Sequence, residues 1–366
     1  MKFSISTQEL NYLLSRVLNG VPAKGTLPIL SNVLLEAYHG ILSITATDLT
    51  VGIRCSSEVQ IEEEGAITLP AKRFGQLVRE LTALNVSVHA NENNIAEIQA
   101  NSSRFRIHGM SAKEFPRLPD LSGAFKVPLQ QKDFRELLNR VSFAVSRDDN
   151  RFVLTGALLQ FSGDKMTLTG TDGKRLARAH LSIASGAEGQ YVIPLKAVEE
   201  IAKNLSDEGD VFLYILSDKI AVEAGNIRVV TKLLSEEYPD VNRVIPERSE
   251  AIVTLHREEL MSLLRQVALF TSENSHSVRF TFGAGDLQIS ANAIEVGEGR
   301  VSMPVNYQGP SLEIAFNPSY FLDILRNSRE ETVTLGLVDA FNPGVITESQ
   351  SVSPLYVIMP MRLSEV

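Results

Sequence analysis

Apolar residues recur along this chain with the spacing of a helix face (i, i+3, i+4, i+7) at three places far apart in the sequence. These positions are Leu10, Leu13, Leu14 and Val17, then Phe134, Leu137, Leu138 and Val141, then Leu260, Leu263, Leu264 and Val267. Such a stripe predicts an amphipathic helix that buries one side. The stripes start 124 and 126 residues apart, which indicates an internal repeat.

A second helix stripe and two strand patterns accompany each of these helices. The second stripes are Phe74, Leu77, Val78 and Leu81, then Val198, Ile201, Ala202 and Leu205, then Phe321, Ile324, Leu325 and Ser328. Prolines 70, 194 and 318 mark their starts, and proline is favoured in the first turn of a helix. Alternating apolar and polar residues predict strands at 42–48, 166–172 and 287–293, and closing strands at 104–108, 227–231 and 355–359.

The same elements in the same order predict an α+β fold made of three copies of one domain, each with two helices packed on antiparallel strands. Turn-forming residues near Ser122-Gly123 and Pro246-Glu247 place the domains at 1–122, 123–247 and 248–366. A unit of this length exceeds the roughly 20–50 residues of a solenoid repeat. Three such units are therefore expected to form a ring or an arc.

Composition favours a cytoplasmic protein without a membrane segment. No apolar run approaches the roughly 18 residues that a membrane helix needs, and the alternating first residues do not resemble a signal peptide. Cys55 is the only cysteine, which excludes an intramolecular disulfide and fits a reducing compartment. It is expected to be an ordinary small residue in a strand.

The distribution of basic residues changes what the net charge implies. A net charge of -9 argues against a surface that is basic throughout. However, the position five residues after the start of each second stripe is basic in all three copies: Arg79, Lys203 and Arg326. At 100° per residue this position lies roughly 150° from the centre of the stripe, so it faces away from the core. An ordinary solvated helix face would explain one such base, whereas three favour a shared positive surface that binds phosphates without reading bases.

The residue patterns of common enzyme sites are missing. The six histidines include no helix-borne metal pair, and the sequence has no P-loop and no G-x-S-x-G motif. We therefore expect no metal, no cofactor and no catalytic residue. Asp48 and Asp172 end strands at equivalent repeat positions, where a role in a turn is expected in preference to acid/base chemistry.

Two alternatives stay open at this stage. One is a triplicated enzyme with its active site in an interdomain cleft, using Asp48 or Asp172. The other is a sequence-specific DNA regulator, although no pair of helices has the short turn of a helix-turn-helix motif.

Five segments resemble the bacterial DNA polymerase III beta subunit family, the replicative sliding clamps. They are Thr26-Leu27-Pro28-Ile29-Leu30, Thr171-Asp172-Gly173-Lys174-Arg175-Leu176, Tyr238-Pro239-Asp240 with Arg243-Val244, Phe316-Asn317 with Ser319-Tyr320, and Tyr356-Val357-Ile358-Met359-Pro360-Met361-Arg362-Leu363. The resemblance runs in order from Met1 to Leu363 and implies the DNA clamp fold. It implies a non-catalytic processivity factor of DNA replication, a head-to-tail homodimeric ring with helices lining the hole. The implied partners are encircled double-stranded DNA, the replicative DNA polymerase catalytic subunit, the clamp loader, and other DNA polymerases and repair proteins.

The resemblance also implies three sets of functional residues. The partner-peptide pocket would comprise Leu154, Thr171, Gly173, Lys174, Arg175, Leu176, Pro239, Arg243, Val244, Tyr320, Val357, Met359, Pro360, Met361 and Arg362. The helix bases Arg73, Arg79, Lys196, Lys203 and Arg326 are already expected to contact DNA from their place in the repeats, and the resemblance adds Lys24, Arg147 and Arg151 on loops. The dimer interface would pair Arg104, Phe105, Arg106 and Ile107 with Leu269, Phe270, Glu295 and Glu298.

Two departures from the family pattern bear on the pocket. Lys174 stands where the most familiar member of the family has histidine, which leaves the peptide preference open. Ser364-Glu365-Val366 extend past the usual end of the family, and their role is open as well.

Overall fold

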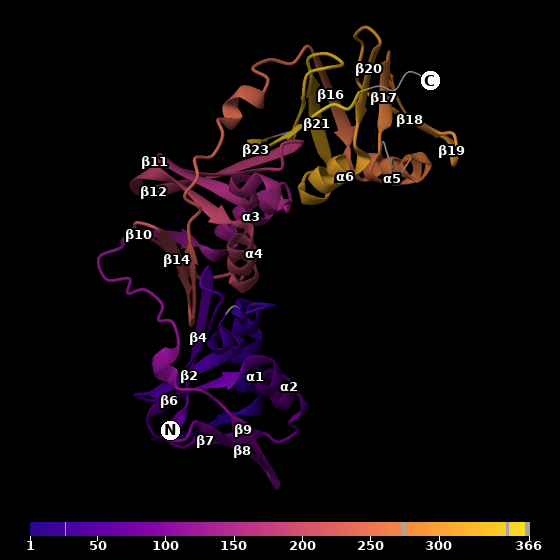
Figure 1. The fold of residues 1–366 in the computed structure, drawn as a ribbon. Helices are drawn as coiled ribbons and strands as arrows, with labels where there is room; N and C mark the ends of the chain where they lie inside the picture. Colours follow the sequence, from indigo (N-terminus) through magenta and orange to yellow (C-terminus); the bar gives the residue numbers. More distant parts are fainter. Residues whose placement is uncertain (26, 273–275, 349–350, 363–366) are drawn as a thin grey trace. The chain divides into compact units, whose positions relative to one another are not determined.

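The computed structural model describes residues 1–25, 27–272, 276–348 and 351–362 (Figure 1). The chain forms two compact units, one of Met1–Arg135 with Lys196–Leu233 and one of Glu136–Leu195 with Leu234–Val366. The second predicted domain therefore contributes to both units. Thr26 and Leu363, which entered the resemblance, and the tail Ser364-Glu365-Val366 lie outside the described residues.

The first unit contains two antiparallel sheets. The smaller sheet has the strand order β5-β1-β7-β8-β9, formed by Gln60–Glu63, Lys2–Ser6, Asn85–Ala90, Ile95–Ala100 and Ser103–His108. The larger sheet has the order β10-β13-β14-β15-β4-β3-β2-β6, formed by Phe125–Gln130, Asp210–Ile215, Lys219–Ala224, Ile227–Lys232, Val51–Glu58, Ile41–Thr47, Asn32–Tyr38 and Gly65–Pro70. Pairing of β15 with β4 joins a strand of the second repeat to a strand of the first.

The second unit also contains two antiparallel sheets. The six-stranded sheet has the order β11-β12-β23-β22-β21-β16, formed by Gly156–Thr171, Arg175–Pro194, Ser351–Ile358, Gly344–Glu348, Thr332–Leu337 and Ala251–His256. The four-stranded sheet has the order β19-β18-β17-β20, formed by Gly297–Pro304, Asp286–Ala293, Val278–Gly283 and Leu312–Phe316. Here β12 pairs with β23, again across two repeats.

The six predicted α-helices are confirmed. The first helix of each repeat is α1 (Thr7–Val17), α3 (Gln131–Ser142) or α5 (Arg257–Val267), and the second is α2 (Ala71–Glu80), α4 (Leu195–Asn204) or α6 (Pro318–Asn327). The four stripe residues of α1 are at most 1% exposed, which places them in the core. Ser6 caps α1 by accepting a hydrogen bond from the backbone N–H of Glu9 at 3.1 Å, so one of the otherwise unpaired first amides is satisfied.

Two details of the second helices differ from the sequence prediction. The last stripe residue, Leu81, Leu205 or Ser328, comes directly after each helix end instead of inside it. Pro70 and Pro194 are the final residues of β6 and β12, and only Pro318 lies in a first helical turn. A strand end tolerates proline because no further ladder N–H is needed there, so the same residue can end a strand and precede a helix.

Cys55 lies fully buried on β4, as expected for a small strand residue. Burial raises the pKa of its thiol to about 11, so the reactive thiolate is scarce near neutral pH. Among the described residues, no helix is long and apolar enough to cross a membrane.

Candidate peptide-binding groove and nucleic-acid face

Asp48 and Asp172, the two aspartates considered as catalytic residues, stabilise turns at equivalent positions of the repeat. Asp48 accepts hydrogen bonds from the backbone N–H groups two and three residues later, at 2.9 and 2.7 Å. Asp172 accepts the same pair of bonds at 2.9 and 3.0 Å. The preceding residues, Thr47 and Thr171, each donate a hydroxyl hydrogen bond across the turn, at 3.0 and 2.6 Å. The carboxylates therefore serve as turn acceptors, as the sequence predicted.

The middle of both turns adopts a left-handed backbone. Gly173 has φ 82° and Leu49 has φ 75°, a region that favours glycine and costs energy for leucine. At Gly173 an added Cβ would lie 2.5 Å from Nη1 of Arg151. The left-handed backbone therefore favours glycine here, whereas the exposed guanidinium of Arg151 could move aside for a side chain.

An apolar cluster lies beneath the turn of Asp172. Leu176 on β12 faces Val357 on β23 in the strand register, and each is 1% exposed. Their buried neighbours in the same cluster are Leu154, Leu158, Val192, Tyr238 and Val241. Two other apolar residues of the predicted partner-peptide pocket are open to solvent instead: Val244 is 42% exposed and Met359 is 38% exposed. The structure therefore divides the residues of the predicted pocket into a buried set, here called the floor, and an exposed set, the rim; we call this candidate surface the peptide groove, after the role expected of it.

Arg175 organises one side of the peptide groove. Its guanidinium contacts the carboxylates of Asp172 and Asp323 at 3.1 and 2.6 Å and donates to the carbonyl of Phe143 at 2.9 Å. It also stacks over the rings of Phe143 and Tyr320, at 5.4 and 4.6 Å from the centroids. With only 12% of its side chain exposed, Arg175 connects α6 to the β11–β12 turn and has little surface left for a ligand.

The other predicted rim residues are more accessible. Gly173, Lys174, Pro239 and Arg362 are exposed, and Pro360 and Met361 are half-buried. Arg243 is 84% exposed and pairs with Asp240 at 3.2 Å. The backbone N–H of Asn242 lowers the pKa of the Asp240 carboxyl through a hydrogen bond, with support from Arg243.

One exposed aromatic at the same strand ends escaped the sequence analysis. Phe341 is 87% exposed in the turn that precedes β22, where its backbone N–H donates to Asp339 at 2.7 Å. Gly344, three residues later, faces Ile358 in the register, so this turn and Met359 lie at the same end of neighbouring strands. No sequence signal singles out a lone phenylalanine in a polar turn, whereas its exposure does.

The first unit contains an equivalent strand pairing that the chain itself covers. Gly52 faces Val230 there, as Leu176 faces Val357 in the second unit. Leu118 occupies the space beside Gly52, since an added Cβ would lie 2.3 Å from its Cδ2. Leu121 packs on Val230 and is 9% exposed. Among the described residues, the pairing in the second unit differs from this one in leaving apolar neighbours, Val244 and Met359, exposed.

The predicted DNA-binding bases lie on helices and loops of both units. Arg73 and Arg79 on α2, Lys203 on α4 and Arg326 on α6 are exposed, as the helical geometry predicted. Lys196 on α4 instead contacts Asp48 at 2.5 Å, which neutralises part of its charge. Lys24, Arg147 and Arg151 are exposed outside the α-helices.

The predicted dimer residues lie on β9 and β19, which are edge strands of their sheets, or on segments close to these strands. Arg104, Phe105 and Arg106 on β9 are exposed, whereas Ile107 is 5% exposed and belongs to the core of its own sheet. Leu269 is 74% exposed, and Glu295 and Glu298 are exposed near β19. Phe270 packs over Gly299, where an added Cβ would lie 2.5 Å from the ring. Ile107 and Phe270 therefore pack within their own units, against the sheet of β9 and against β19 respectively.

The described residues contain no group of three or more histidine, cysteine, aspartate or glutamate side chains placed to hold a metal ion. The candidate sites are thus an apolar groove and basic helix faces.

Comparison with known proteins defines the class of this fold. Three family models match in succession: the N-terminal domain of the DNA polymerase III beta subunit over residues 1–119, its central domain over 128–240 and its C-terminal domain over 242–362. The chain therefore has the three-domain DNA clamp fold. It belongs to the DNA polymerase III beta subunit family, whose members are the sliding clamps that act as processivity factors in DNA replication.

Relatives and solved structures agree over the full length. The beta sliding clamp of Chlamydia pneumoniae is 49% identical over 367 residues, covering 100% of both chains, and that of Pseudomonas putida is 34% identical, covering 99% of this chain and 100% of the relative. A sliding clamp from Pseudomonas aeruginosa bound to griselimycin is 32% identical with a TM-score of 0.95, covering 99% and 100% of the two chains. The clamp of Bacillus subtilis has a TM-score of 0.96 at 25% identity, covering 99% of each chain.

Proposed function

We propose that this chain forms a head-to-tail homodimeric ring around duplex DNA and recruits its partners through the peptide groove. The partners would be the replicative DNA polymerase catalytic subunit, the clamp loader, and other DNA polymerases and repair proteins. The observation that carries the proposal is the combination of a buried floor, Leu176 and Val357, with an exposed apolar rim, Val244 and Met359. An exposed apolar rim over a well-packed floor suits a short extended peptide with one or two apolar side chains.

Basic helix faces support the DNA part of the proposal. Arg79, Lys203 and Arg326 occupy the same helix position in the three repeats, and all are exposed. Contacts from such residues go to phosphates, so binding would be insensitive to base sequence and sensitive to salt. Because Lys196 is paired with Asp48 at 2.5 Å, we expect it to contribute less than the other bases to phosphate binding.

Sheet ends support the dimer part of the proposal. β9 ends one sheet of the first unit and β19 ends one sheet of the second, and a ring built head to tail would join these unlike ends. Phe105 and Leu269 would supply the apolar contact, and Arg104 and Arg106 would face Glu295 and Glu298. Arg106 already pairs with Glu97 at 2.7 Å, so its contribution across the interface would be small. Domain boundaries near 122 and 247 remain part of this proposal.

A clamp without catalytic activity, acting on DNA in the cytoplasm, accounts for these features better than an enzyme. The rival reading placed acid/base chemistry on Asp48 or Asp172, but one oxygen of each carboxylate accepts two backbone hydrogen bonds. The second oxygen pairs with Lys196 in one case and with Arg175 in the other. These two groups therefore have defined structural roles.

Calorimetry with griselimycin tests the groove, since that compound is bound in the clamp from Pseudomonas aeruginosa. Met359→Ala and Val244→Ala each remove an exposed apolar side chain that a bound peptide would cover, and truncation of an anchor residue desolvated in this way typically costs about 1–4 kcal/mol. We expect at least one of them to weaken binding about tenfold or more. Lys165→Ala, an exposed change on β11, is the matched control. Full affinity in both rim variants would exclude the groove and leave the ring unaffected.

A further inference from the structure

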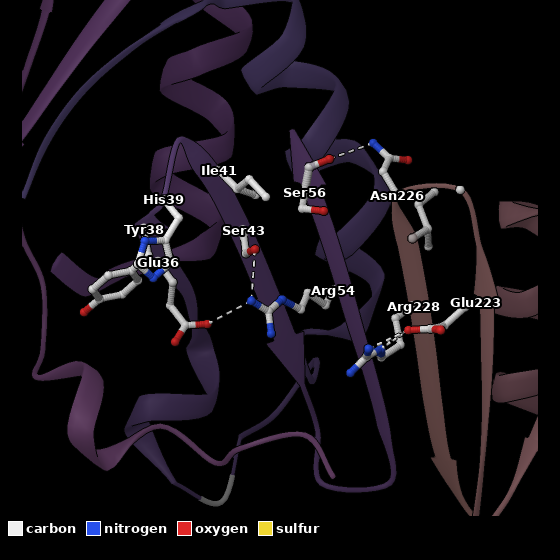
Figure 2. A pocket seen from close by; sticks show the side chains of 12 residues that line it. Glu36, Tyr38, His39, Ile41, Ser43, Arg54, Ser56, Glu223, Asn226 and Arg228 are labelled. Atoms are coloured by element: carbon white, nitrogen blue, oxygen red, sulfur yellow. Dashed lines mark hydrogen bonds and ion pairs between the residues drawn. The ribbon is translucent and has the colours of Figure 1, made fainter. Parts of the chain in front are cut away.

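The outer face of the large sheet in the first unit contains a charged groove that the ring and peptide functions do not use. Two adjoining hollows of about 450 and 890 Å³ share four lining residues, Glu36, Tyr38, Arg54 and Arg228. One continues over β14 and β15, and the other extends to the segment 111–118. We call the two hollows together the outer groove, and Figure 2 shows the first of them.

Strand register places the outer groove on the sheet face opposite α1. On β4, Val51, Ile53 and Cys55 are fully buried and share one side of the strand, and α1 packs on this strand. Arg54 lies between them in sequence, so its side chain leaves the other side. A duplex held against the helices would therefore be separated from the outer groove by the sheet.

Two arginines at the centre of the outer groove face one another across a strand pair. Arg54 and Arg228 are direct register partners on β4 and β15, an arrangement of like charges that is destabilising by itself. Figure 2 shows each turned toward its own glutamate: Arg54 toward Glu36 at 3.7 Å, and Arg228 toward Glu223 at 2.5 Å. The chain thus balances two adjacent positive charges with carboxylates on either side.

The guanidinium of Arg54 is only partly engaged by this arrangement. Its hydrogen bond within the described residues goes to Ser43 Oγ at 3.0 Å, and 40% of its side chain is exposed. A guanidinium has five N–H donors, so Arg54 retains donors that an incoming carboxylate can use. The 3.7 Å separation from Glu36 is longer than a direct charged hydrogen bond, so this internal pair is readily exchanged.

The rest of the lining adds positive charge and apolar surface. Lys113 and Arg117 are exposed on one wall. Together with Arg54 and Arg228 they make four basic side chains, whereas the lining has three carboxylates, Glu36, Glu92 and Glu223. This local excess of positive charge lies on a chain whose net charge is -9. Tyr38 and Ile41 are 42% and 44% exposed. Charge and apolar contact together match an acidic segment that also carries a large apolar side chain.

We propose that the outer groove docks an extended acidic peptide of a partner protein. Carboxylates of this peptide would take the places of Glu36 and Glu223 at Arg54 and Arg228, while an apolar side chain packs on Tyr38 and Ile41. A partner held in the peptide groove would then have a second, charge-dependent contact on the same chain. The outer groove lies within the first unit, so the proposal does not depend on the peptide groove assignment.

Fluorescence anisotropy of a labelled hexapeptide of four glutamates and two leucines tests this site. We expect saturable binding that weakens with salt, and a hexapeptide of four glutamines and two leucines should bind about tenfold more weakly. Arg54→Gln/Arg228→Gln should weaken the acidic peptide about tenfold or more. Lys232→Gln/Arg248→Gln removes the same charge from exposed positions outside the outer groove and should not.

A second variant keeps the test decisive even if the arginine variant unfolds. Glu36→Gln/Glu223→Gln removes the internal competitors and should tighten the acidic peptide severalfold. Equal affinity in this variant and the wild type overturns the proposal. So does stronger competition by a short single-stranded oligonucleotide than by unlabelled acidic peptide, because it would show that the arginines select phosphates.

Discussion

Met359 donates its backbone N–H to the carbonyl of Lys174 at 2.9 Å, which ties the residue after β23 to the β11–β12 turn. The turn is itself fixed by Asp172, and Arg175 anchors it to α6. The rim of the peptide groove is therefore held by hydrogen bonds from three parts of the chain. A preformed groove loses little conformational entropy when a peptide binds, so most of the affinity should depend on the side chains at its rim.

Floor and rim residues should differ sharply in their effect on stability. Leu176→Ala empties space in a fully buried cluster and should cost about 2–5 kcal/mol of unfolding free energy. Met359→Ala, at a site 38% exposed, should cost much less. Urea denaturation of both variants measures the difference, and comparable losses would mean that the floor and rim are not distinct.

The strained turn in the first repeat offers a stabilising change. Leu49 has φ 75° and is 51% exposed, so Leu49→Gly should relieve backbone strain and raise the unfolding free energy by about 1 kcal/mol. Leu84→Gly, at an exposed leucine without a positive φ, is the control and should lower it. Thermal melts of the two variants should move in opposite directions.

The pH dependence of the unfolding free energy should reveal the buried carboxyl of Glu348. This residue is 4% exposed, and burial raises the pKa of its carboxyl above the usual 4.5, although Arg140 at 2.9 Å opposes the shift. The folded state then binds the proton more tightly than the unfolded state, so this group lowers stability as pH rises from about 4.5 through its folded pKa. Compared with Glu348→Gln, the wild type should lose unfolding free energy across that window. Parallel pH profiles in urea denaturation would refute this assignment.

Replacement of one exposed residue should separate the proposed dimer. Leu269 is 74% exposed and can be charged without disturbing a core, so Leu269→Lys should give folded monomers that do not stay on circular DNA. Ile252→Lys, at an exposed site on β16, should remain dimeric. Sedimentation velocity decides the matter, and a dimeric Leu269→Lys protein would place the interface elsewhere.

Periodic features of the fold, including which helix positions are exposed, were predictable from the sequence, whereas exposure set by the pairing of distant strands was not. The stripes of α1, α3 and α5 follow from helical spacing, and the Asp48 and Asp172 turns follow from their repeated position. The separation of Leu176 from Met359 depends on which strands neighbour them in the sheet, and β23 is far from β12 in sequence. The pairing of Lys196 with Asp48 likewise joins segments that are far apart in the sequence, which no local pattern encodes.

Leu121 and Val244 show that the repeats have diverged at this strand pairing. Leu121 closes the equivalent pairing in the first unit at 9% exposure, while Val244 leaves the second open at 42%. Under the proposed function, each chain would therefore offer one open peptide groove, although it contains two strand pairings of this kind. A dimeric ring would hold two peptides and no more at these sites, so one partner can stay bound at one groove while a successor is loaded at the other.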